Sequence, residues 1–147
     1  MFEIKTFETK DLIGNKEFLA LCKEYAKCNA IPNTDAVQNF QIEGYLAWGD
    51  CVTFGVLFKN HKMIGLAVVV KEYHAHTNEI LALLDSFFIL PEYRGHNHAK
   101  ALLNWAKAWA KSITAPVLLL TAPAGSRLEK VYTRKFHRLE STFLIEV

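Results

Sequence analysis

Segments with strand-like and helix-like hydrophobic periodicity follow one another along the chain. Residues Phe2–Phe7 alternate apolar and polar side chains, which predicts a half-buried strand. Two further apolar runs, Cys51–Phe58 and Met63–Val70, flank a polar turn and predict a β-hairpin. Leu81–Leu90 is almost continuously apolar, as expected for a strand that is covered on both faces.

Helical spacing appears between and after these strands. Asp11 or Asn15 can cap a helix whose apolar residues share one face. Those residues are Phe18, Leu19, Leu21, Cys22 and Tyr25. Residues 29–35 interrupt the pattern with Pro32 and several Asn and Asp side chains, and a weaker helical pattern covers residues 36–45. A second strong amphipathic pattern predicts a helix over residues 97–111.

The last part of the chain completes the order of elements. Residues 117–121 predict a short buried strand, parallel to the strand at 81–90 because a helix connects the two. Ser126 and Glu129 form a capping-box pattern that starts a further helix, and residues 139–147 predict a closing strand. The order β-α-α-β-β-β-α-β-α-β indicates an α/β (α+β) fold, with a mixed, mostly antiparallel sheet and helices on both faces.

The junction between the strand at 81–90 and the helix at 97–111 concentrates the candidate chemistry. Pro91 ends strand pairing because it lacks an amide hydrogen. The first N–H groups of a helix have no internal partner, and with the helix dipole they attract an anion. Arg94 and Lys100 add positive charge there. The pattern predicts an anion-binding loop, with an ordinary βα turn as the alternative.

Residues 91–99, Pro-Glu-Tyr-Arg-Gly-His-Asn-His-Ala, with the following Lys-Ala-Leu-Leu, resemble the acyl-CoA pyrophosphate loop of the GNAT family of N-acetyltransferases. That loop runs Arg or Gln, two residues, Gly, one residue, then Gly or Ala. Arg94 and Ala99 match its two ends. Asn97 replaces the usual Gly, and Asn is the non-glycine residue that best tolerates a left-handed turn. The resemblance extends over nearly all of residues 1–147 and implies one GNAT domain that uses acetyl-CoA.

The resemblance also implies how acetyl-CoA is held. In the family two parallel strands separate beyond the loop, and the pantetheine arm bonds to the backbone of the first strand. Backbone amides of the loop hold the pyrophosphate, and protonated histidines there would help. The implied cofactor-binding residues are Phe87, Phe88, Ile89, Arg94, Gly95, His96, Asn97, His98, Ala99 and Lys100.

Tyr132 is the candidate general acid for the departing thiolate. The sequence from Tyr132 to Phe136, Tyr-Thr-Arg-Lys-Phe, resembles the family motif Tyr-x-Lys/Arg-x-Gly-Phe, although the Gly is missing here. Gly125 stands near a position where many members have Asn. A tyrosine that only packs is the alternative interpretation.

Asp85 is the candidate general base. A carboxylate within an apolar run costs free energy unless it has a partner or a function. We expect Asp85 on the same strand face as Phe87 and Ile89. Glu79 is the second choice for the general base. The alternative is a structural carboxylate bonded to a turn or a serine.

Two further groups of residues carry weaker predictions. By the resemblance, the segment between the first two strands forms the acceptor wall, and core packing is the alternative for its aromatic residues Phe40, Tyr45 and Trp48. Two His-x-His pairs have a spacing that suits metal ligands in a strand. We expect no metal there, because no cysteine is near either pair, His74/His76 or His96/His98.

Composition and charge limit the remaining functions. The chain is 51% hydrophobic and 12% aromatic, which argues against disorder. Cys22, Cys28 and Cys51 are too few and irregular for a disulfide framework, and none is close to the proposed site in sequence, which favours direct attack by the amine over an acyl-cysteine intermediate. The first residues lack a signal-peptide pattern and no apolar run could span a membrane, so we expect a cytoplasmic protein.

The charges are distributed unevenly along the chain. Residues 1–93 contain eight Lys or Arg and twelve Asp or Glu, whereas residues 94–147 contain nine and three. An anionic ligand such as CoA explains this, and a nucleic-acid surface is the less favoured explanation. The sequence therefore predicts an N-acetyltransferase that acts on a small-molecule or protein amine, with a non-catalytic binding module for nucleic acid or a protein as the alternative. Assembly as a homodimer is left open.

Overall fold

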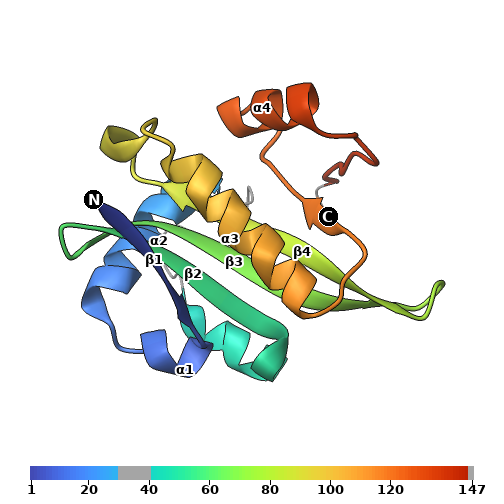
Figure 1. Cartoon of the computed structure of the whole chain (residues 1–147), viewed down its shortest axis with the longest axis horizontal. Coiled ribbons are helices and arrows are strands. Elements are labelled where there is room, and N and C mark those ends of the chain that lie inside the picture. Colours follow the sequence, from blue (N-terminus) through green and yellow to red (C-terminus); the bar gives the residue numbers. More distant parts are fainter. Residues whose placement is uncertain (30–40, 146–147) are drawn as a thin grey trace.

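The computed structural model describes residues 1–29 and 41–145. A five-stranded sheet has the order β1-β2-β3-β4-β5, so that consecutive strands are neighbours (Figure 1). The strands are β1 (Phe2–Phe7), β2 (Val52–Lys59), β3 (Lys62–His74), β4 (Glu79–Ile89) and β5 (Leu118–Leu120). The first four strands pair antiparallel, and β5 runs parallel to β4. The predicted mixed, mostly antiparallel sheet is confirmed.

Helices lie on both faces of this sheet, also as predicted. They are α1 (Thr9–Leu12), α2 (Lys16–Asn29), α3 (His98–Ser112) and α4 (Arg127–Lys135), with short 3-10 helices η2 (Ile42–Cys51) and η3 (Pro91–Tyr93). Figure 1 shows α3 in front of the sheet and α2 behind it. Of the two caps considered for the second helix, Asn15 is used, because its Oδ1 accepts a hydrogen bond from the Phe18 amide at 2.9 Å. None of the helices described is long and apolar enough to cross a membrane.

The core has one layer on each face of the sheet. Phe18, Leu21 and Cys22 of α2 pack with Phe54 and Leu66 of the sheet. On the other face, the core residues of α3 and the sheet are Leu57, Ile64, Ala67, Val69, Leu84, Ile89, Leu102 and Ala106. These side chains are less than a tenth exposed, so most of the hydrophobic stabilisation comes from two thin layers that hold β4 between them.

The α3 layer requires a glycine in β2. A Cβ atom at Gly55 would lie 2.6 Å from the Trp105 ring. Trp105 cannot easily give way, because its Nε1 donates to Thr6 Oγ1 at 3.0 Å. Gly55 therefore lets α3 lie close to the sheet, which brings the N-terminus of α3 near the end of β4.

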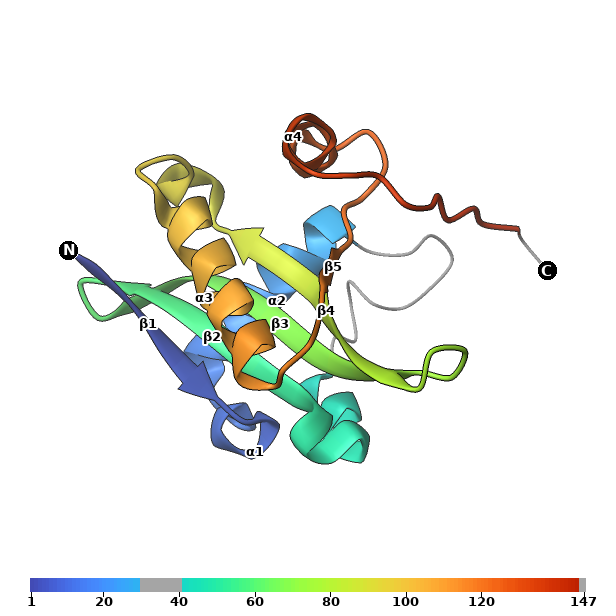
Figure 2. The same cartoon turned by 45° about the vertical axis from the view of Figure 1, so that its right-hand side comes forward.

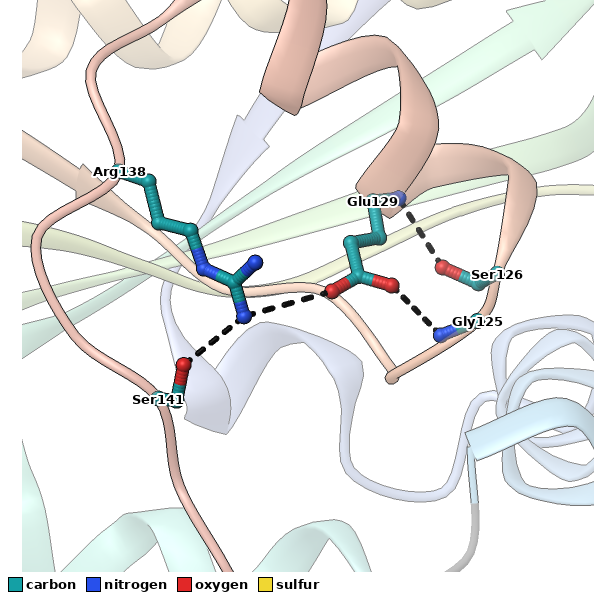
Figure 3. Close-up of polar contacts among 5 residues, drawn as sticks. All are labelled: Gly125, Ser126, Glu129, Arg138 and Ser141. Carbon is teal, nitrogen blue, oxygen red and sulfur yellow. Dashed lines mark hydrogen bonds and ion pairs between the residues drawn. The ribbon is translucent and has the colours of Figure 1, made fainter.

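The predicted closing strand at 139–147 is wrong for the residues described. Residues 139–145 form no strand, and residues 146–147 lie outside the described part. The segment is anchored at the start of α4 instead: Glu129 accepts from the Gly125 amide at 2.6 Å, and its carboxylate lies 3.9 Å from Arg138, which donates to Ser141 (Figure 3). A strand needs a partner along its length, whereas β5 is only three residues long.

The remaining differences concern boundaries. The strand β3 extends four residues beyond the predicted end at Val70, to His74. The strand β4 begins at Glu79, two residues before the predicted start. Part of the weak helical pattern at 36–45 lies outside the described residues, and the part that is described belongs to η2, a 3-10 helix that continues to Cys51. Ser126 caps α4 as predicted, because its hydroxyl accepts from the Glu129 amide at 3.1 Å (Figure 3).

Candidate active site

The strands β4 and β5 separate part-way along β4. Their parallel ladder has three pairs and ends at Leu84 and Leu120. The next residue of the second strand, Thr121, places its hydroxyl 3.4 Å from the carbonyl oxygens of both Leu84 and Asp85. Beyond this point β4 continues to Ile89 with β3 as its only partner among the described strands (Figure 2). One edge of β4 is therefore open over residues 85–89, where an extended ligand can pair with its backbone.

The loop between β4 and α3 leaves several backbone amides free. Gly95, His96 and Asn97 have φ angles of 95°, 50° and 65°. The predicted left-handed conformation of Asn97 is thus present, and it directly precedes the first residue of α3. Among the described residues, the amides of Gly95, His96, Asn97, Ala99 and Lys100 make no hydrogen bond. Consecutive amides in such a loop, at a helix N-terminus, form an anion-binding concavity.

Positive side chains surround this loop. Arg94 Nε donates to the Ile89 carbonyl at 3.0 Å, and its guanidinium lies 5.7 Å from the centre of the Phe88 ring, so it bridges the loop and the open end of β4. Lys59 and Lys62, from the β2–β3 turn, lie 5.8 and 5.2 Å from the centre of the Tyr93 ring. These two lysines could not be recognised from the sequence, because only the fold brings that turn beside the loop.

The side chain of His98 points into the protein interior. Its side chain is 2% exposed, its Nδ1 lies 2.7 Å from the Tyr93 carbonyl, and its ring packs edge-on against Phe2. The His98 amide is also engaged, because it donates to the Gly95 carbonyl at 3.2 Å. His98 therefore holds the loop against α3 from inside, and its ring cannot reach an anion in solvent. His96 is exposed beside the loop, where a phosphate contact is open to it.

A β-bulge in β4 decides where Asp85 lies. In the β3–β4 ladder Val68 pairs with Ser86 and Val69 pairs with Leu84, which leaves Asp85 as the extra residue. Bulges reverse the alternation of side chains and are common beside active sites. The expectation that Asp85 shares a face with Phe87 and Ile89 is therefore wrong. Those two side chains pack on the α3 face, whereas Asp85 and Ser86 both lie on the α2 face.

On that face Asp85 is held by two hydroxyl groups. Tyr45 of η2 donates to Asp85 Oδ2 at 3.1 Å, and Ser86 donates to the same oxygen at 3.0 Å. Burial is the main cause that raises the pKa of the Tyr45 hydroxyl, and the neighbouring Asp85 charge raises it further. Tyr45 is therefore a neutral donor across the physiological pH range. Ser86 was missed from the sequence, because unbroken alternation would have put it on the opposite face.

A small cavity of about 10 Å³ lies beside these polar groups. Tyr25 of α2, Tyr45 and Ser86 line it together with apolar side chains and Cys22. Burial raises the pKa of the Tyr25 hydroxyl. The cavity can hold one water molecule at most, so it is too small to serve as an acceptor pocket.

Cys22 is nearer to this cluster than the sequence suggested. It is 3% exposed, and burial raises the pKa of its thiol to about 12. A thiol with that pKa is almost entirely protonated near neutral pH, and only the thiolate is strongly nucleophilic. The proximity of Cys22 therefore does not make it a candidate for an acyl-cysteine intermediate.

Tyr132 lies on α4, which follows β5. Its hydroxyl is buried and has no hydrogen-bond partner among the described residues, and its ring packs against Phe136 at 5.8 Å. Burial raises the pKa of this hydroxyl to about 12. A buried hydroxyl without a partner costs free energy, so this group is a candidate for contact with a ligand.

The other predicted residues lie in different environments. Trp48 is 47% exposed and packs edge-on against Tyr45 at 5.5 Å, and of these two aromatics it is Tyr45 that contacts Asp85. Phe40 lies outside the described residues. Glu79 lies at the exposed start of β4, opposite His74. His74 and His76 contact each other at that distant hairpin tip.

The sequence of residues 18–137 matches the acetyltransferase (GNAT) family. The chain belongs to this family. The predicted family, fold and classification as an acyltransferase are therefore confirmed. No curated protein matches the sequence.

Solved structures of GNAT acetyltransferases share the fold. A ribosomal-protein-alanine N-acetyltransferase from Brucella melitensis biovar Abortus 2308 aligns with a TM-score of 0.76 and 20% identity, over 100% of this chain and 99% of that chain. The aminoglycoside N-acetyltransferase AAC(6′)-Iy in complex with CoA aligns with a TM-score of 0.75 and 17% identity, over 100% of this chain and 95% of that chain. A predicted acetyltransferase with acetyl-CoA from Clostridium acetobutylicum aligns with a TM-score of 0.74 and 17% identity, over 99% of this chain and 96% of that chain.

Proposed function

We propose that this protein transfers an acetyl group from acetyl-CoA to a primary amine, by direct attack of the amine in a ternary complex. The observation that carries the proposal is the open edge of β4 at residues 85–89, which leads directly into a loop with free amides and positive charge. An extended arm with an anionic end fits this arrangement, and acetyl-CoA has that form. We also propose that residues 1–147 act as one acyl-CoA-binding domain.

The residues that would hold acetyl-CoA follow from this placement. Backbone groups of Phe87 to Ile89 would pair with the pantetheine arm. The free amides of Gly95, His96, Asn97, Ala99 and Lys100 would bind the pyrophosphate. Arg94, already at the junction of strand and loop, would neutralise its charge, and Lys59 and Lys62 lie near the Tyr93 ring that precedes Arg94.

Asp85 would carry the proton transfer, and Tyr132 would stabilise the leaving group. Asp85 would accept the proton of the attacking amine as the nitrogen–carbon bond forms. The Tyr132 hydroxyl, without a partner among the described residues, would donate a hydrogen bond to the sulfur as the carbon–sulfur bond breaks. The buried thiol of Cys22 supports direct attack over a covalent enzyme intermediate.

The proposal can be tested by binding and turnover. Acetyl-CoA should raise Tm by mass action, while pantetheine, which lacks the pyrophosphate, should raise it much less. Thiol release from acetyl-CoA should then require an amine, and mass spectrometry should find that amine acetylated. Aminoglycosides and alanine-containing peptides are the first acceptors to screen, because two of the similar proteins are named as an aminoglycoside N-acetyltransferase and a ribosomal-protein-alanine N-acetyltransferase. Polyamines extend the screen.

The matched control for the loop uses two lysines of α3. Lys100 lies in the first turn of the helix, and Lys107 is exposed two turns further on. Lys100→Ala should weaken acetyl-CoA binding, whereas Lys107→Ala should not. No shift in Tm at millimolar acetyl-CoA, or equal weakening by both substitutions, would contradict the proposed cofactor site.

Asn97 provides a separate test of the loop. Its φ of 65° suits Gly and Asn, and disfavours β-branched residues. Asn97→Gly should bind acetyl-CoA at least as tightly as the wild type. Asn97→Val should bind it roughly tenfold more weakly, because a left-handed conformation costs an ordinary residue roughly 1–2 kcal/mol. Calorimetric titration measures all three affinities, and equal values would show that this turn does not form the binding loop.

A further inference from the structure

We propose that Tyr45 is a positioning residue that orients the Asp85 carboxylate for proton transfer. The inference rests on the proposed function, since it assumes that Asp85 is the base. Tyr45 donates to Asp85 Oδ2 at 3.1 Å, and Ser86 donates to the same oxygen at 3.0 Å. No donor contacts Asp85 Oδ1 in the part of the chain that the structure describes. One oxygen is thus held in place, and the other is presented to the acceptor.

The Tyr45 hydroxyl is itself held firmly. The Tyr45 ring packs edge-on against Phe54 of β2 and against Trp48, with both centre-to-centre distances 5.5 Å. Two perpendicular aromatic contacts fix the ring, so that little rotational freedom is lost when the hydroxyl donates. The hydroxyl comes from η2 and meets a residue 40 positions further along the chain.

The β-bulge makes this contact possible. Without the extra residue, Ser86 would alternate to the face opposite Asp85, and it could not donate to the carboxylate from the same side. With the bulge, Asp85 and Ser86 both face η2. Ser86 is 4% exposed, so bulk solvent has little access to its hydroxyl. Two independent elements, η2 and β4, therefore fix the orientation of one carboxylate.

This arrangement assigns different roles to the groups in the proton transfer. Asp85 Oδ1 takes the proton from the acceptor nitrogen, and Tyr45 and Ser86 keep their own protons throughout. Fixing a base within a small range of angles increases the fraction of encounters that are productive. Loss of the Tyr45 hydroxyl should therefore lower kcat more than it changes KM for acetyl-CoA.

A double-mutant cycle in the full-length protein tests the assignment. Tyr45→Phe keeps the aromatic packing and should lower kcat about tenfold to a hundredfold, as expected for a hydrogen bond to a charged group. In an Asp85→Asn background the same substitution should have little further effect, because its target has lost its function. Tyr73→Phe, at the exposed tip of the β3–β4 hairpin, is the matched control and should not change kcat in either background.

Several results would overturn the inference. Equal losses from Tyr45→Phe in both backgrounds would mean that Tyr45 acts on the fold and not through Asp85. A normal kcat for Tyr45→Phe beside an inactive Asp85→Asn would remove Tyr45 and keep the proposed base. Full activity of Asp85→Asn would reject both Asp85 as the base and Tyr45 as its positioning residue. Absence of acetyl transfer by the wild type would reject the proposed function as well.

A second cycle covers the case in which Asp85→Asn is too slow to measure. Tyr45→Phe and Ser86→Ala each remove one donor to the same oxygen. Their effects on kcat should be coupled, with the double variant differing at least severalfold from the product of the single effects. Strictly multiplicative losses, with Tm unchanged, would show that the two hydroxyls do not share one function.

Discussion

Asp85→Asn should lower kcat by about 10²–10⁴-fold, which is the usual contribution of a positioned acid or base. Asparagine has nearly the same shape, and its amide oxygen can still accept from Tyr45 and Ser86. It cannot take a proton from the amine. The loss should therefore appear in kcat, with the affinity for acetyl-CoA nearly unchanged.

Glu79→Gln is the control that matches this change. It replaces an acid by its amide on the same strand, at the exposed end far from the bulge. Turnover of Glu79→Gln should equal that of the wild type. Steady-state rates with one accepted amine, at saturating acetyl-CoA, separate the two sites. An Asp85→Asn rate within twofold of the wild type, with chemistry shown to limit turnover, would reject Asp85 as the base.

The order of elements up to α4, and the loop that precedes α3, could be predicted, because each depends on local pattern. The change from the apolar run ending at Leu90 to helical spacing after Asn97 marks both the end of β4 and the start of α3. The left-handed conformation of Asn97 could likewise be expected from its residue type. These features require little knowledge of what packs against them.

The position of Asp85 could not be predicted in the same way. Two-residue periodicity assigns a strand face only while the ladder is regular, and the bulge between Leu84 and Ser86 shifts every later side chain by one. The bulge depends on the pairing of β4 with β3. Contacts from other elements, such as that of Tyr45, were therefore also hidden in the sequence.

Tertiary contacts also explain the burial of His98 and the absence of a strand at residues 139–145. The loop before His98 has a polar sequence, which predicts an exposed side chain. In the fold His98 instead contacts the Tyr93 carbonyl and the Phe2 ring. Residues 139–145 have a composition typical of a strand, but Arg138 bonds to Ser141 and lies near Glu129, while Phe143 is 90% exposed. Local propensity decides less than the presence of a partner strand.

Tyr132→Phe should lower kcat by roughly 10- to 100-fold with little change in the affinity for acetyl-CoA. Burial raises the pKa of the Tyr132 hydroxyl to about 12. A cysteine-like thiol has a pKa of about 8.5, so full proton transfer from this tyrosine to the leaving thiolate would be uphill. We therefore expect the hydroxyl to act chiefly as a hydrogen-bond donor to the developing charge. Such a bond contributes about 1.5–3 kcal/mol, which corresponds to the stated range.

The raised pKa also predicts the pH dependence. Burial favours the neutral form of a phenol, so the Tyr132 hydroxyl stays protonated until the pH approaches about 12. The donor is therefore present throughout the usual assay range, and wild-type and Tyr132→Phe profiles of kcat should have the same shape between about pH 6 and 9. If the wild-type profile fell at high pH and this fall disappeared in Tyr132→Phe, Tyr132 would titrate within that range and would transfer its proton fully.

Packing must be separated from this chemical role. Phe136→Leu disturbs the ring contact of Tyr132 but keeps the hydroxyl. It should therefore lower Tm while kcat stays close to the wild-type value. Tyr132→Phe should leave Tm unchanged or slightly raised, because it removes a buried hydroxyl that has no partner among the described residues. A normal kcat for Tyr132→Phe, together with a large loss of Tm for Tyr132→Ala, would assign Tyr132 to packing alone.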